Sequence, residues 1–149
     1  MTGPKNKTMK YRITAFDNLK HREQVISLWS EVFGYGTPHN DPDIAINRKI
    51  DFDDGLFLVA VDDNEVIGTV MAGYDGHRGW IYSMAVSTQH RNRGIGSALL
   101  SYAEERLSEK GCLKINLQIL DGNEQVEAFY QKNGYRTEKR ISMGKPLIS

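Results

Sequence analysis

Three apolar segments in the middle of the chain, residues 56–61, 65–74 and 80–86, follow one another across short polar connections. The connections read Asp-Asp-Asn and Asp-Gly-His-Arg-Gly. Asp, Asn and Gly are typical turn residues because they tolerate the backbone conformations that tight turns need. Strands joined by turns this short pair in an antiparallel manner. The sequence therefore predicts an antiparallel meander of three strands, and any fold proposed for this chain must contain it.

The segments before the meander predict one strand and two helices. Residues 11–16 alternate well enough to form a strand with one buried face. Within residues 19–33 the apolar side chains form one helical stripe, made by Val25, Leu28, Trp29 and Val32. Residues 34–41 have the composition of a loop, after which Asp41 and Pro42 are suited to begin a short helix that reaches about residue 50.

The segments after the meander predict two further helices and the remaining strands. In order, the pattern gives a polar loop at 87–93, a helix from Gly94 to Gly111, a strand at 113–119, a helix at 123–132 and one or two strands within 135–141 and 143–147. We therefore expect a mixed α+β fold with a central, mostly antiparallel sheet of about six or seven strands and about four helices. The chain has 149 residues, so one domain over residues 10–149 is expected.

Composition excludes several classes of protein. Nineteen Lys and Arg balance nineteen Asp and Glu, so a protein that coats nucleic acid through bulk charge is not expected. Cys112 is the single cysteine, which excludes an internal disulfide, and no Cys/His spacing suggests a metal. The longest apolar run, residues 56–61, is too short to span a bilayer. We expect a soluble, cytoplasmic protein whose residues 1–9 are a disordered start or an expression remnant.

Two glycines, Gly94 and Gly96, lie where a predicted strand passes into a predicted helix. A glycine has no Cβ atom to hold a ligand away from the backbone, and the N–H groups of a helix N-terminus carry about half a positive charge. His90, Arg91 and Arg93 immediately precede the helix. This combination predicts an anion site, with a pyrophosphate as the favoured ligand. Glycines that only shape a tight turn, beside solvated arginines, would give the same spacing.

Two common phosphate-binding motifs fit this region poorly. The P-loop pattern GxxxxGK[ST] does not occur in the chain. A Rossmann dinucleotide site is closer, because Gly94 and Gly96 follow a strand and Asp121 ends the next one. However, Leu99 stands where the third glycine would be, and too little chain remains after Asp121 to complete a doubly wound sheet.

The residues around the two glycines resemble the GNAT family of acyl-CoA-dependent N-acetyltransferases in two blocks. The first block has the pattern R/Q-x-x-G-x-G/A, which Arg91, Gly94 and Gly96 match. The second block has an Asn, a Tyr seven residues later and a Gly-aromatic pair shortly after, matched by Asn123, Tyr130, Gly134 and Tyr135. The resemblance spans about residues 10–147, and within the family it is closest to the small bacterial YpeA-type members.

The resemblance implies a GNAT-like fold that uses acetyl-CoA as acyl donor and needs no metal. In this family the strand before the glycine loop diverges from its neighbour, and its backbone groups pair with the pantetheine arm and polarise the thioester. The loop and helix N-terminus bind the pyrophosphate. The residues that would bind the coenzyme are Met84, Ala85, Val86, Arg91, Asn92, Arg93, Gly94, Ile95, Gly96, Ser97 and Asn123.

Tyr130 resembles the tyrosine that protonates the departing coenzyme A thiolate in this family. A thiol has a pKa near 8.5 and a tyrosine near 10, so a tyrosine stays protonated at neutral pH and can donate. The alternative for Tyr130 is a core aromatic residue beside Phe129. For Asn123 the alternative is a helix N-cap, and it could serve as both cap and coenzyme ligand.

The general base is left unassigned by the sequence. Some family members carry a Glu on the strand that corresponds to residues 80–86, but here Tyr82 and Ser83 are the polar side chains of that strand, beside the indole of Trp80. The remaining candidates come from the neighbouring turn, the first helix and the 34–41 loop, and they are Asp75, His77, Glu31 and Asp41.

The favoured function is transfer of an acetyl group from acetyl-CoA to a primary amine of a small molecule, peptide or protein, with no nucleic-acid or membrane partner. A non-catalytic acyl-CoA sensor and a nucleotide-binding module are the alternatives. Edge strands near the C-terminus suggest a homodimer. Residues 1–74 carry a net charge of −3 and residues 75–149 one of +3. The basic half suits the polyanionic coenzyme, and the acidic stretch 41–65 could attract a cationic amine.

Overall fold

The computed structural model describes residues 10–34 and 38–148. Its helices are α1 (Asn18–Phe33), α2 (Pro42–Phe52), α3 (Ile95–Glu109) and α4 (Glu124–Lys132), with short 3-10 turns η2 (Pro38–Asn40) and η3 (Thr88–His90). Its strands are β1 (Arg12–Ala15), β2 (Phe57–Asp62), β3 (Glu65–Tyr74), β4 (Gly79–Val86) and β5 (Ile115–Leu117). Residues 1–9, expected to be a disordered start, lie outside the described residues.

The five strands of the described chain form one sheet in the order β1-β2-β3-β4-β5. The pairs from β1 to β4 are antiparallel, and β4 pairs with β5 in parallel. The parallel pair requires a crossover connection, which α3 supplies. The predicted meander, 56–61, 65–74 and 80–86, is confirmed as β2, β3 and β4.

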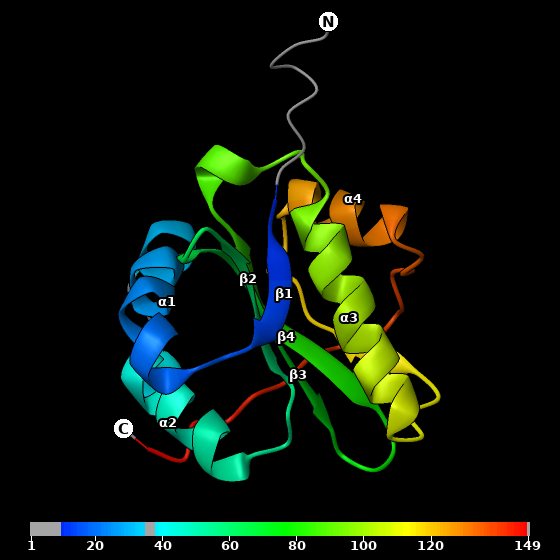
Figure 1. Ribbon diagram of the computed structural model, residues 1–149. Coiled ribbons are helices and arrows are strands. Elements are labelled where there is room, and N and C mark those ends of the chain that lie inside the picture. Colours follow the sequence, from blue (N-terminus) through cyan, green and yellow to red (C-terminus); the bar gives the residue numbers. More distant parts are fainter. Residues whose placement is uncertain (1–9, 35–37, 149) are drawn as a thin grey trace, which may run out of the picture.

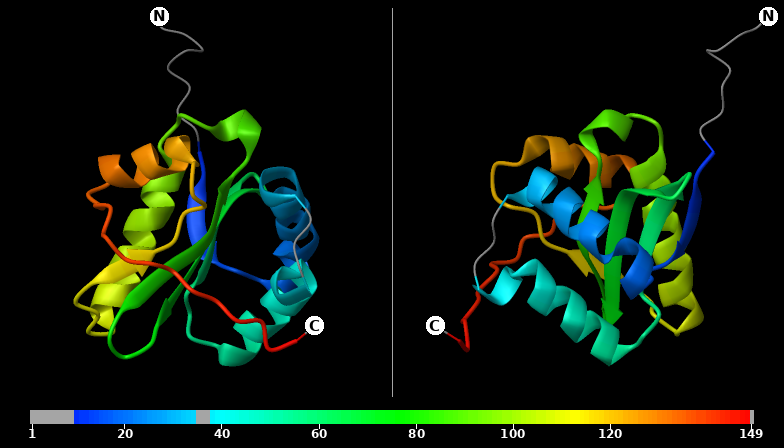
Figure 2. Two further views of the ribbon diagram at one scale, coloured as in Figure 1. Left: turned by 180° about the vertical axis from the view of Figure 1, so that it is seen from behind. Right: turned by 60° about the vertical axis from the view of Figure 1, so that its left-hand side comes forward.

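Helices cover both faces of the sheet (Figures 1 and 2). α1 and α2 pack on one face, where Val25, Trp29 and Ile46 join buried side chains of β2 and β3. α3 and α4 pack on the other, where Leu99 and Tyr130 belong to a second buried cluster. The core therefore has two layers with the sheet between them, and the mixed α+β class is confirmed.

Local sequence signals explain where the first two helices begin and end. The Asp17 carboxylate accepts hydrogen bonds from the N–H groups of Leu19 and Lys20, and Asp41 caps α2 in the same way. Pro42 then occupies the first turn of α2, where its missing N–H costs nothing. Gly34 ends α1 with a φ of 75°.

The expected six or seven strands are one or two too many. Residues 135–141 and 143–147 form no strand, and the predicted strand 113–119 shrinks to β5. The segment after α4 contacts β5 through side chains instead: Lys114 and Asn116 donate to the Glu138 carboxylate, and Gln118 donates to Ser142. Side-chain hydrogen bonds of this kind hold an alternating segment in place without the backbone hydrogen bonds that define a strand.

Candidate active site

β4 and β5 pair only where β4 begins. The pairs are Gly79 with Ile115, Trp80 with Asn116 and Ile81 with Leu117. β4 continues to Val86, and within the described chain no strand pairs with residues 82–86 on that side. Apart from the Val86 carbonyl, which accepts from Arg91 Nε, β5 leaves the backbone groups along this edge of β4 open to a ligand. The family resemblance predicts coenzyme contacts for Met84, Ala85 and Val86.

A β-bulge in β4 shapes this edge. The register against β3 shifts between Thr69 and Met71, and Ser83 has a φ of 51°, which is unusual for a residue with a side chain. The Thr69 hydroxyl is fully buried and donates to the Ser83 carbonyl at 2.9 Å, while Trp29 Nε1 donates to the Thr69 hydroxyl at 2.8 Å. This buried chain of hydrogen bonds fixes the bulge against α1.

The bulge also decides which way the following side chains point. Met84 and Val86 pack on the α3 side of the sheet, whereas Ala85 joins the cluster beneath α1. The strict alternation of β4 before the bulge would place these side chains on the opposite faces. Nothing in the sequence marks this position, since Ser is not a residue that typically adopts positive φ.

The N-terminus of α3 is built to expose its N–H groups. Asn92 and Gly94 have φ values of 63° and 81°, and the N-cap Gly94 has no side chain to bond the first turn. The first intrahelical bond runs from Ala98 N–H to Gly94 O at 3.0 Å. The N–H groups of Ile95, Gly96 and Ser97 therefore have no partner within the helix, which is the arrangement that binds anions.

Gly94 and Gly96 are required for different structural reasons. A Cβ atom at Gly94 would meet nothing within 4 Å, so its positive φ is what requires glycine. A Cβ atom at Gly96 would lie 3.1 Å from the Phe129 ring of α4. Gly96 therefore lets α3 and α4 approach each other, a packing role that the spacing alone did not reveal.

The loop between β4 and α3 is held at both ends. The Glu31 carboxylate of α1 accepts from the Thr88 N–H at 2.9 Å and from its hydroxyl at 2.8 Å, and these bonds lower the pKa of Glu31. Arg91 Nε donates to the Val86 carbonyl at 3.3 Å, so the side chain of Arg91 lies against the end of β4. His90 Nδ1 is buried and has no hydrogen-bond partner in the described part of the chain.

Tyr130 is a buried residue of α4. It is 7% exposed, and its ring makes edge contacts with the rings of Phe129 and Tyr135. Burial raises the pKa of Tyr130 to about 12. The core aromatic role is thus confirmed. The role in protonating a thiolate stays a prediction, although a phenol with this pKa is protonated at any physiological pH and able to donate.

Asn123 caps α4, because its side-chain oxygen accepts from the Val126 N–H at 3.3 Å. The expected capping role is confirmed, and a contact with the coenzyme stays a prediction. Helix α4 therefore joins two residues of the second sequence block, Asn123 as its N-cap and Tyr130 near its end, and the other two, Gly134 and Tyr135, follow the helix.

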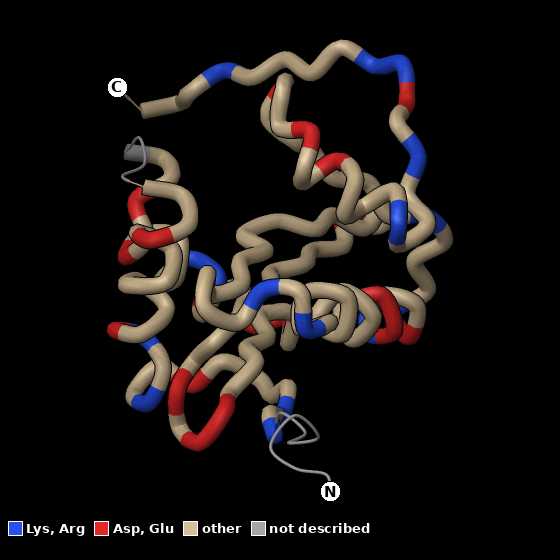
Figure 3. The backbone as a smooth tube through the Cα atoms, turned by 90° about the horizontal axis from the view of Figure 1, so that it is seen from above, with Lys and Arg blue, Asp and Glu red and all other residues tan. Residues whose placement is uncertain are grey.

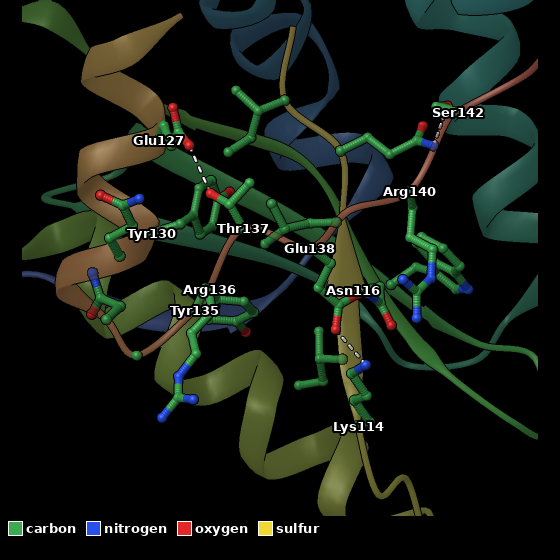
Figure 4. Close-up of a pocket in the computed structure, with 18 of the residues that line it drawn as sticks. Lys114, Asn116, Glu127, Tyr130, Tyr135, Arg136, Thr137, Glu138, Arg140 and Ser142 are labelled. Carbon is green, nitrogen blue, oxygen red and sulfur yellow. Dashed lines mark hydrogen bonds and ion pairs between the residues drawn. The ribbon is translucent and has the colours of Figure 1, made fainter. Parts of the chain in front are cut away.

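A cavity of about 970 Å³ lies between β5, α4 and the segment after α4 (Figure 4). Charged and polar side chains from these three elements line it, among them Lys114, Glu127, Glu138 and Arg140. Of the predicted site residues only Tyr130 borders it. Trp80, at the start of β4, also lines the cavity, whereas residues 82–86 do not, so the cavity and the exposed edge of β4 are different features.

The candidate bases are mostly occupied by structural bonds. The Asp75 carboxylate accepts from the Arg78 and His77 N–H groups and from Trp80 Nε1, which lowers its pKa to about 2. Glu31 holds Thr88 and Asp41 caps α2. A carboxylate with a pKa near 2 is a weak proton acceptor at neutral pH, so Asp75 is unsuited to be the base.

The structure adds a cluster that the sequence did not single out. Lys49 of α2 is 8% exposed and bonds both the Asp54 carboxylate and the Tyr82 hydroxyl. The sequence contained a signal for this buried lysine. Lys49 follows the fully buried Ile46 by three residues and therefore lies on the inward face of α2. A charged residue at such a position is rarely buried without partners.

The acidic stretch 41–65 does not form one surface (Figure 3). Asp51, Asp53 and Asp54 lie at the end of α2, near the beginning of β2, and Asp54 is paired with Lys49. Asp41 and Asp43 lie at the beginning of α2, and the third acidic group, residues 62–65, forms the turn at the opposite end of β2. The acidic residues of the stretch are therefore divided among three places, and attraction of a cationic amine by this stretch stays a prediction.

No group of three or more His, Cys, Asp or Glu side chains within the described residues is arranged to hold a metal ion. No helix in the same part of the chain combines the length and the apolar character needed to cross a bilayer.

Comparisons with known proteins place this geometry in a family. Residues 22–135 match the model of the acetyltransferase (GNAT) family. An acetyltransferase of the GNAT family from Staphylococcus aureus Mu50 is similar in structure, with a TM-score of 0.74, 22% identity and coverage of 88% of this chain and 87% of that one. YpeA-type membership is not addressed by these matches and stays a prediction.

Two further solved structures share the fold at lower sequence identity. The aminoglycoside acetyltransferase AAC(6')-Iy, bound to the bisubstrate analogue CoA-S-monomethyl-acetylneamine, has a TM-score of 0.74 and 19% identity over 92% of this chain and 98% of that one. Glucosamine-6-phosphate N-acetyltransferase from Arabidopsis thaliana has a TM-score of 0.70 and 19% identity over 93% and 99%.

Proposed function

Because the chain belongs to the GNAT family of acetyltransferases, we propose that it transfers the acetyl group of acetyl-CoA directly to a primary amine within a ternary complex. The amine nitrogen attacks the thioester carbonyl, the carbon–sulfur bond breaks, and the thiolate takes a proton from the enzyme. The amine gives up its extra proton to solvent or to a base that remains unassigned.

One observation carries this proposal: the free edge of β4 leads directly into the uncapped N-terminus of α3. The amide groups of the pantetheine arm would pair with the backbone of residues 84–86, as a short added strand does. The pyrophosphate would bind the N–H groups of Ile95, Gly96 and Ser97, with Arg91, Asn92, Arg93 and Gly94 in the adjoining turn.

Tyr130 is the proposed proton donor to the thiolate. Its raised pKa keeps the hydroxyl protonated, and its burial keeps bulk water from competing for the proton transfer. Asn123, at the start of the same helix, is the proposed contact to the pantetheine side.

The substitution Tyr130→Phe tests this assignment. Turnover, measured as release of coenzyme A thiol with an amine acceptor, is expected to fall about 100-fold or more, while the affinity for acetyl-CoA stays unchanged. Tyr102→Phe is the matched control, because Tyr102 is an exposed tyrosine of α3. Unchanged turnover of Tyr130→Phe across pH and across acceptors would exclude Tyr130 as the acid.

A non-catalytic acyl-CoA sensor is the second candidate function. It is favoured by the absence of a carboxylate on β4 and by the bonds that already occupy Asp75 and Glu31. One measurement, the release of coenzyme A thiol, distinguishes the two functions. Thiol release at an enzymatic rate with any amine eliminates the sensor, whereas acetyl-CoA binding without release over a broad amine panel eliminates the transferase.

A further inference from the structure

Lys49 is buried beside β4 with all its protons engaged. Its ammonium group donates to the Asp54 carboxylate at 2.8 Å, to the Ala72 carbonyl and to the Tyr82 hydroxyl oxygen at 2.8 Å. An ammonium group has three protons, and three acceptors surround this one. Lys49 is therefore fixed in place, and it fixes the Tyr82 hydroxyl in turn.

The bond from Lys49 determines what Tyr82 can offer to a ligand. Because the Tyr82 oxygen accepts from Lys49, the hydroxyl proton must point away from Lys49. Tyr82 is 42% exposed and directly follows Ile81, the last residue of β4 that pairs with β5. The Tyr82 hydroxyl lies over β3, beside Ala72 and Gly73, and is a positioned hydrogen-bond donor on the side of the sheet that α1 and α2 cover.

Exposed aromatic rings lie near Lys49 and along the same face of β4. The Phe52 ring is 69% exposed, and its centroid lies 5.9 Å from Lys49 Nζ, while the Tyr82 ring centroid lies 5.3 Å from the same atom. Trp80 lies two residues before Tyr82, hence on the same face of β4, and is 37% exposed. The Trp80 indole N–H donates a hydrogen bond to the Asp75 carboxylate. Solvent-exposed aromatic rings favour the binding of a ligand whose body is apolar or aromatic.

We propose that Tyr82, positioned by Lys49, selects the acceptor: an amine with an apolar or aromatic body and a carbonyl or hydroxyl oxygen close to the amino group. This inference rests on the proposed transferase function and names the substrate class of that same site. The Tyr82 hydroxyl donates to the oxygen of the acceptor, and the rings of Phe52 and Trp80 contact its body. Lys49 is a positioning residue, since it acts on the acceptor only through Tyr82.

Two amines that differ in one group test the proposal. L-phenylalaninamide and 2-phenylethylamine share the amine and the ring, but only the first carries a carbonyl oxygen. With acetyl-CoA and the native protein, L-phenylalaninamide is expected to have a KM about tenfold lower. Tyr82→Phe should raise the KM for L-phenylalaninamide about tenfold, the effect of one hydrogen bond, and leave the KM for 2-phenylethylamine and the binding of coenzyme A unchanged.

A matched control and a binding measurement keep this inference separate from the proposed function. Tyr102 has the same exposed fraction as Tyr82, 42%, so Tyr102→Phe should keep the preference for the amide. Calorimetric binding of L-phenylalaninamide to the coenzyme A complex needs no turnover. If Tyr82→Phe binds L-phenylalaninamide more weakly than the native protein, the contact with Tyr82 is supported. If the native protein then releases no thiol, only the transferase proposal fails. Equal binding by the native protein and Tyr82→Phe, no binding by the native protein, or an equal change in KM for both amines overturns it.

Discussion

At the scale of single residues, the buried Tyr130 and the partly buried Tyr135 couple the stability of the fold to pH. Burial raises the pKa of Tyr130 to about 12. The pKa of Tyr135 is also raised, first by burial and then by the hydrogen bond that its hydroxyl donates to Glu104 at 2.8 Å. In the unfolded chain both groups titrate near pH 10. The stabilisation from keeping them neutral is therefore complete below pH 10 and is lost as pH rises.

This linkage predicts a specific alkaline destabilisation. Between the unfolded pKa and the folded pKa of Tyr130 the unfolded chain has lost a proton that the folded chain retains, so the free energy of unfolding falls with pH. From pH 8 to pH 11 the native protein is expected to lose about 1.4 kcal/mol more than Tyr130→Phe. Urea unfolding at the two pH values measures this difference. An equal loss in both proteins would contradict burial as the cause.

At the scale of elements, the contact between α3 and α4 depends on Gly96. A Cβ atom at this position would lie 3.1 Å from the Phe129 ring, and Phe129 itself makes an edge contact with the Tyr130 ring. Gly96→Ala is expected to lower the free energy of unfolding by about 1–3 kcal/mol, the usual cost of overpacking. It should also reduce turnover, because displacing Phe129 moves Tyr130.

Gly144→Ala is the control for this prediction. Gly144 has no heavy atom within 4 Å of a built Cβ atom and no positive φ, so its replacement should leave both stability and turnover unchanged. Denaturant unfolding and thiol release are measured on both variants. A Gly96→Ala protein as stable as the native one would show that the Phe129 ring moves aside without cost.

The same elements show what the sequence could and could not reveal. Continuous apolar segments and turn residues located β2, β3 and β4, because those signals are local, and β2 and β3 are buried on both faces. The bulge at Ser83 was not visible, since it is held by the side chain of Thr69 from a neighbouring strand. The strands predicted within residues 135–141 and 143–147 were wrong. An alternating pattern shows only that every second side chain finds a partner. Here the side chains of Asn116 and Gln118 bond Glu138 and Ser142, without the backbone pairing that defines a strand.

At the scale of the whole molecule, zero net charge conceals a division of charge along the chain. The second half carries the excess of Lys and Arg, and Figure 3 shows that part of this excess lies on the segment after α4 rather than at the N-terminus of α3. On the proposed function, a polyanionic coenzyme is attracted by a general field from the basic half and bound by specific N–H groups at one helix end. The specific part should discriminate among nucleotides that the general field would treat alike.

Ligand-dependent melting measures this discrimination. A ligand that binds only the folded chain adds about 2.7 kcal/mol at 100 times its Kd, which corresponds to a rise of roughly 5–10 °C in Tm for a chain of this size. Acetyl-CoA and coenzyme A are expected to give this rise, whereas NAD and ATP at the same concentration should give little, because neither offers a pantetheine arm to the edge of β4. A larger shift with NAD or ATP would instead indicate a nucleotide-binding module, and the free β4 edge would then need a different explanation.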